Sequence, residues 1–99
     1  MTKTYIVSVK VWLYPGNGGW HFVSIPPDTT QDIDFYFSHA KKGWGSLPVT
    51  VTVGSTTWTT SIFADKKTGT YLLPVKADVR KAEGIKLGDD ISVRLELHD

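Results

Sequence analysis

The chain contains no cysteine among its 99 residues, which excludes disulfide bonds and thiolate metal sites. A protein without disulfides tolerates a reducing compartment, and we expect this one in the cytoplasm. No apolar run is long enough for a membrane-spanning helix, and the first twelve residues lack the apolar stretch and cleavage site of a signal peptide. We therefore expect no membrane association.

A surplus of either charge is also absent, because 11 Lys and Arg residues face 10 Asp and Glu residues. Nucleic acids and anionic membranes usually select a basic surplus. The balance argues against nucleic acid as the main partner. What the chain does have is aromatic side chains, with four Trp, four Tyr and four Phe. These supply large buried areas, and a chain of this length forms one domain, residues 1–99, with a single core.

Alternation of apolar and polar residues predicts six strands separated by turn residues. In the first strand, Tyr5, Val7, Val9, Val11 and Leu13 occupy one face. The predicted strands cover residues 4–14, 20–25, 49–53, 57–64, 71–75 and 91–97.

Two short helices are predicted between the strands. The first starts at Asp28 as N-cap, with Gln31 completing a capping box and with Ile33 and Phe37 on its apolar face. A loop over residues 40–46 follows it, and His39 is expected near its C-terminal end. The second helix covers residues 77–83 and ends at Gly84, which suits a left-handed C′ position.

The two halves of the sequence, about 1–53 and 54–99, share one pattern of elements. Residues 5–13 align with 55–63, 20–25 with 70–75, and 49–53 with 91–95. Each half is then strand, strand, helix, strand. The expected fold is mainly β: a six-stranded split (double-split) β-barrel with two short helices, built from an internal β-β-α-β repeat.

Two resemblances fit this pattern. The segment Val75–Val93, VKADVRKAEGIKLGDDISV, resembles the AbrB-type swapped-hairpin domain, in which two such units interleave as a homodimer. The whole chain is similar to DUF1905, a bacterial family of unknown function, through the segments GWHFV at 19–23, GWGSLPV at 43–49, WTTS at 58–61, YLLPVK at 71–76 and RKAEGI at 80–85. This second resemblance implies a split β-barrel and no particular activity.

The residues that could form a ligand or partner surface come from both halves. Glycines beside Trp44 would permit close approach of a ligand. The expected surface consists of Trp20, His21, Trp44, Ser46, Lys76, Arg80 and Lys81. Core packing is the alternative role for each tryptophan.

No catalytic residue, metal ligand or cofactor is expected. The spacing of His21, His39 and His98 matches no metal motif and defines no catalytic triad. The function expected from the sequence is a binding or interaction module for an unknown small ligand or protein, acting as a monomer because both halves lie in one chain. The first alternative is an AbrB-like DNA-binding regulator. It is weakened because Thr30 and Gln31 stand where the other half has Arg80 and Lys81. A small hydrolase-like enzyme ranks third.

Overall fold

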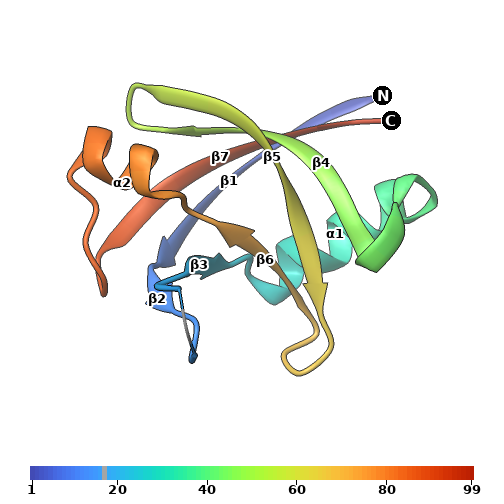
Figure 1. Ribbon diagram of the computed structural model, residues 1–99. Coiled ribbons are helices and arrows are strands. Elements are labelled where there is room, and N and C mark those ends of the chain that lie inside the picture. Colours follow the sequence, from blue (N-terminus) through green and yellow to red (C-terminus); the bar gives the residue numbers. More distant parts are fainter. Residues whose placement is uncertain (17) are drawn as a thin grey trace.

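The computed structural model describes residues 1–16 and 18–99, and at Trp44 it describes the backbone only. The elements follow one another as β1 (Thr2–Lys10), β2 (Trp12–Leu13), β3 (His21–Ser24), α1 (Pro27–Phe37), β4 (Ser46–Val53), β5 (Thr56–Asp65), β6 (Thr70–Pro74), α2 (Ala77–Glu83) and β7 (Asp90–His98). All pairs are antiparallel, in the order β1-β7-β4-β5-β6-β3-β2. This sheet of seven strands curls into a half-barrel, with α1 and α2 on opposite sides of the view (Figure 1).

The first predicted strand is divided at Val11. β1 pairs with β7, whereas β2 pairs with β3 at the other end of the sheet order. Val11 lies between them, donating its N–H to the carbonyl of Asp89 at 2.9 Å and accepting the N–H of Gly88 at 2.9 Å. One continuous stretch of chain therefore supplies both ends of the curled sheet. The prediction of a single strand over residues 4–14 was wrong at this point.

Alternation places every second residue of β4, and of the parts of β1 and β7 that reach the core, inside the curl, whereas β6 is buried from Thr70 to Leu73. The helices add Ile33 and Phe37 from α1 and Val79 from α2, as their apolar spacing predicted. The most deeply buried large side chains are Tyr71, Phe37, Ile25, Ile33, Leu47, Ile62, Leu73, Leu95 and Leu97. A core with contributions from every long strand fixes the sheet that positions the surface described below.

Helix α1 starts differently from the expected capping box. Pro26 is its N-cap residue and Pro27 its first helical residue, where a fixed φ and a missing N–H are favourable. Asp28 lies inside the first turn and accepts the N–H of Thr29 at 2.8 Å, so the predicted N-cap role of Asp28 was wrong. A 3-10 turn, Ser38–Ala40, follows α1 directly, and the predicted loop over residues 40–46 contains a second one, Gly43–Gly45, before β4 begins at Ser46.

Helix α2 has the predicted boundaries and the predicted end. Gly84 has φ of 63°, in the left-handed region, and Ile85 donates its N–H to the carbonyl of Arg80 at 2.8 Å. Ile85 is buried, which completes the hydrophobic closure of this cap. Across residues 1–16 and 18–99, no helix combines the length and the apolar character needed to cross a membrane.

Candidate ligand-binding surface

Four aromatic side chains lie together on the outer face of the hairpin formed by β2 and β3. Trp12 and Phe22 are partners in the ladder, and Tyr14 donates its N–H to the carbonyl of Trp20 at 2.8 Å. The ring of Phe22 is central, with centroids 5.5 Å from Trp12, 5.7 Å from Tyr14 and 6.2 Å from Trp20. We call these four residues the aromatic surface.

The aromatic surface is open to solvent. Tyr14 is 49% exposed and Trp20 is 59% exposed, while the indole N–H of Trp12 donates to Ser24 Oγ at 3.0 Å. Single exposed apolar side chains are common on proteins, but contiguous ones mark contact sites. From Val11 to Pro27 the sequence also has no Asp, Glu, Lys or Arg. The hairpin therefore presents exposed aromatic rings without formal charge.

The apolar character continues beyond the hairpin onto the neighbouring strands. Phe22 has Pro74 of β6 as its ladder partner, and Leu72 of β6 lies between Ser24 and Phe63. Phe63 on β5 is 39% exposed. The outer face thus continues from the aromatic surface past the buried Leu72 to Phe63, and its most exposed rings belong to the aromatic surface.

Of the predicted site residues, Trp20 lies on this surface and His21 lies beside it. The Nδ1 atom of His21 is 2.6 Å from the carbonyl oxygen of Gly19, and the His21 carbonyl accepts the N–H of Val75 at 2.9 Å. Arg80 donates its Nε–H to the Val75 carbonyl at 3.1 Å. Val75 therefore brings His21 and the start of α2 close to one another. Lys76, the N-cap residue of α2, and Lys81 are both exposed, and neither lines the cleft between Tyr14, Trp20 and Phe22.

Ser46 lies at the far edge of this outer face, as the ladder partner of Phe63. It begins β4 and donates its hydroxyl to the carbonyl of Gly43 at 3.1 Å. Strands β5 and β6 separate β4 from β3 in the sheet order, so Ser46 is not a neighbour of Trp20. The side chain of Trp44, predicted to belong to the same surface, lies outside the described part of the chain. The structure thus places Trp20 and Ser46 at opposite edges of one outer face.

Trp12, Tyr14 and Phe22 were missed when the sequence was considered alone. Within residues 4–14 the prediction concerned the buried face. The opposite face was described only by Ser8 and Lys10, and it was therefore taken to be polar. The same alternation, continued to Tyr14 and paired across the hairpin with Trp20 and Phe22, would have predicted a shared outer face.

A polar cleft beside α1 is the other site with several functional groups. It is lined by residues of α1, β5, β6 and the turn between the two strands, among them Asp34, Lys66 and Tyr71. The Tyr71 hydroxyl donates to Asp34 Oδ1 at 2.5 Å, and Lys41 Nζ is 3.1 Å from the same oxygen. Burial, followed by the hydrogen bond to Asp34, raises the pKa of Tyr71 to about 12. These groups satisfy one another, and they hold α1 against β6.

A similar group attaches α1 to β1. The Tyr5 hydroxyl donates to Asp32 Oδ2 at 2.5 Å, and Lys3 Nζ donates to the same oxygen at 2.9 Å. The Tyr5 bond and then the Lys3 bond lower the pKa of Asp32 below its ordinary value, and burial raises the pKa of Tyr5. Asp32 and Asp34 therefore fix the two sides of one helix to different strands.

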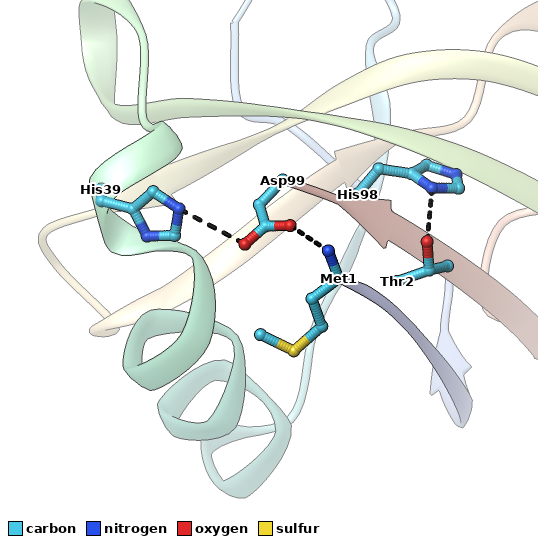
Figure 2. A network of polar contacts seen from close by, with 5 residues as sticks. All are labelled: Met1, Thr2, His39, His98 and Asp99. Atoms are coloured by element: carbon cyan, nitrogen blue, oxygen red, sulfur yellow. Dashed lines mark hydrogen bonds and ion pairs between the residues drawn. The ribbon is translucent and has the colours of Figure 1, made fainter.

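The ends of the chain are joined by a third polar network (Figure 2). Figure 2 shows the Asp99 carboxylate between the Met1 ammonium and His39, whose Nε2 is 3.7 Å from Asp99 Oδ2. His98, one residue from the end, has its Nδ1 2.8 Å from the Thr2 hydroxyl. His98 thus links the two ends of the chain, and His39 links the turn after α1 to Asp99. Among residues 1–16 and 18–99, no three His, Cys, Asp or Glu residues are arranged to hold a metal ion.

Fold and surface together define a small, mainly β domain with a curled antiparallel sheet, two helices and an exposed uncharged aromatic face. The chain matches the model of the domain of unknown function DUF1905 over residues 8–95, and it belongs to that family. The predicted resemblance to this family is confirmed, while the likeness of Val75–Val93 to AbrB-type domains stays a prediction. A search of curated proteins finds no match.

Proposed function

We propose that this domain is a binding module that contacts its ligand or partner through the aromatic surface of the β2–β3 hairpin. The observation that carries the proposal is the contact of four aromatic rings around Phe22 on an exposed face without formal charge. Exposed Trp and Tyr provide a large contact area at a small entropic cost, and they are enriched where proteins bind. The proposal assigns no catalytic residue and places the protein in the cytoplasm.

The surface can be tested by screening a fragment library against the labelled protein by two-dimensional NMR. Bound fragments should shift the amides of Tyr14, Trp20 and Phe22, and Trp20→Ala should abolish those shifts. Phe35→Ala is the matched control, because Phe35 is an aromatic residue on α1 that is 80% exposed and lies outside the surface. Fragments that bind equally well to Trp20→Ala would refute this assignment.

We also propose that the curled sheet is a six-stranded split barrel made of two β-β-α-β halves. The sheet order supports this, because exchanging the halves converts β1–β7 into β5–β4 and β2–β3 into β5–β6. The same exchange returns β3–β6 and β4–β7 to themselves. Burial refines the alignment of the first strands: Val11 corresponds to buried Ile62, one residue beyond the predicted match with Ser61. A one-residue shift matters because it exchanges the two faces of a strand.

If each half completes the other within one chain, the protein is a monomer that folds without a partner subunit. Light scattering over a wide concentration range should then give the mass of one chain. An obligate dimer, with loss of folded protein on dilution, would contradict this part of the proposal. The DNA-binding alternative depends on Arg80 and Lys81. The Nε–H of Arg80 already donates a hydrogen bond to the Val75 carbonyl, just before α2, which weakens this alternative.

A further inference from the structure

The most exposed part of the aromatic surface contains a small cleft. Its lining consists of Tyr14, Trp20 and Phe22, and its volume is about 250 Å³. The Trp20 ring is nearly parallel to that of Phe22, at 15°, whereas the Tyr14 ring is inclined to Phe22 by 66°. A group that enters this cleft therefore meets aromatic rings in two different orientations.

The backbone holds these rings in place. Tyr14 and Trp20 are joined by a main-chain hydrogen bond of 2.8 Å, and Phe22 is fixed in the ladder between Trp12 and Pro74. The paired hairpin therefore fixes the backbone from which these rings project before a ligand arrives, which lowers the entropic cost of binding.

The electrostatic character of the cleft follows from what lines it. The face of an aromatic ring carries partial negative charge, and it attracts a cation within about 6 Å of its centroid. The lining offers the Tyr14 hydroxyl and the Trp20 indole N–H as its polar side-chain groups, and it includes no carboxylate. Elsewhere in the described chain, lysine ammonium groups already lie over the rings of Tyr5, Tyr36 and Tyr71. The rings of the cleft are not among these.

We propose that the cleft binds the quaternary ammonium group of a small molecule; this inference rests on the proposed binding function of the aromatic surface. A quaternary ammonium has no N–H, so it needs no hydrogen-bond acceptor and gains from each ring face that it contacts. A primary ammonium would find one acceptor in the lining, the Tyr14 hydroxyl, for its three donors, and a sugar would lack partners for most of its hydroxyls. Anions would face the negative side of the rings.

The test compares choline with 3,3-dimethylbutan-1-ol, in which a neutral carbon replaces the charged nitrogen. Each is titrated into the labelled protein, and binding is followed at the amides of Tyr14, Trp20 and Phe22. Choline should bind about 2- to 30-fold more tightly than the alcohol, the range that the cation–π energy supports. Equal affinity of the two compounds, or an absence of choline shifts at these amides, would overturn the proposal.

Variants separate ring chemistry from folding. Trp20→Phe and Tyr14→Phe keep an aromatic face and should retain the preference for choline, whereas Trp20→Ala should lose it. Phe35→Ala should bind as the unaltered protein does. If choline does not bind while library fragments still bind at Trp20, the proposed ligand class is wrong and the proposal that the aromatic surface binds a ligand is retained. If Trp20→Ala changes neither choline nor fragment binding, both proposals fail.

Discussion

Thr30 connects α1 to β6 and to Ile25, the residue that follows β3. Replacing it with valine should destabilise the fold strongly, although the change exchanges only a hydroxyl for a methyl group. Its hydroxyl donates to the carbonyl of Ile25 at 3.2 Å and accepts the N–H of Tyr71 at 3.3 Å. The residue is only 4% exposed, so water cannot readily replace these partners. Valine has nearly the shape of threonine and creates no large cavity. The change therefore removes hydrogen bonds without removing much packing.

A buried donor or acceptor left without a partner costs about 1–3 kcal/mol. For a domain of this size, each kcal/mol lowers Tm by about 4–8 °C, so Thr30→Val should lower Tm by roughly 5 to 20 °C. The assay is thermal unfolding followed by circular dichroism. Hydrogen exchange should also show faster exchange of the Tyr71 amide, whose acceptor has been lost.

Two matched variants control for other effects of valine. Thr30→Ser keeps the hydroxyl and loses one methyl group, so the Tyr71 amide should stay protected. Thr29→Val places the same β-branched side chain in the same helical turn, at a half-buried position. A Thr30→Val protein that melts within about 2 °C of the original, with the Tyr71 amide still protected, would show that the hydroxyl does not join α1 to the sheet.

Three further outcomes are expected. Gly84→Val should lower the free energy of unfolding by at least about 1–2 kcal/mol, because Gly84 has φ of 63°. Gly84→Asn should lower it less, since asparagine tolerates this conformation better. An unchanged denaturation midpoint for the valine variant would refute the cap. The pKa of Asp32 in the folded protein lies below its ordinary value. Its contribution to the stability of the fold is therefore present above pH ~4, and it is lost as the pH falls through the pKa of the folded state. Asp32→Asn should therefore weaken the pH dependence of stability in acid, and identical acid profiles would argue against the Tyr5–Asp32 bond. The pKa of Tyr71 is raised to about 12 in the folded protein. Its contribution to the stability of the fold is therefore complete below the ordinary pKa of 10, and it is lost as the pH rises toward 12. The pKa of Tyr5 is raised as well, so titration of phenolate absorbance should show two late tyrosines, of which Tyr71→Phe should remove one. An unchanged number of late tyrosines in Tyr71→Phe would contradict the network with Asp34.

Local sequence signals predicted the elements whose ends are determined locally. Helix α2 has the predicted limits because Gly84 stops it without reference to distant residues. The buried faces of β4 and β7 were likewise correct, since strict alternation within each strand determines them.

Features that depend on distant partners could not be read in the same way. The division at Val11 arises because β7 and β3 pair with successive parts of one stretch, and neither partner is visible within residues 4–14. The aromatic surface depends on the register of the β2–β3 hairpin, whose turn contains Gly16, Gly18 and Gly19 at positive φ. A turn with that many glycines permits several registers, so the contacts of Trp20 and Phe22 could not be derived from spacing alone.

The adjacency of the two chain ends makes the domain a suitable subject for circular permutation. Thr2 and His98 are partners at the end of the β1–β7 ladder, so a short peptide could join residues 1 and 99 (Figure 1). New ends could be opened at the exposed turn of Gly54 and Ser55, between β4 and β5. The rearranged chain would begin with β5 and finish with β4, and every strand pair of the sheet would be retained.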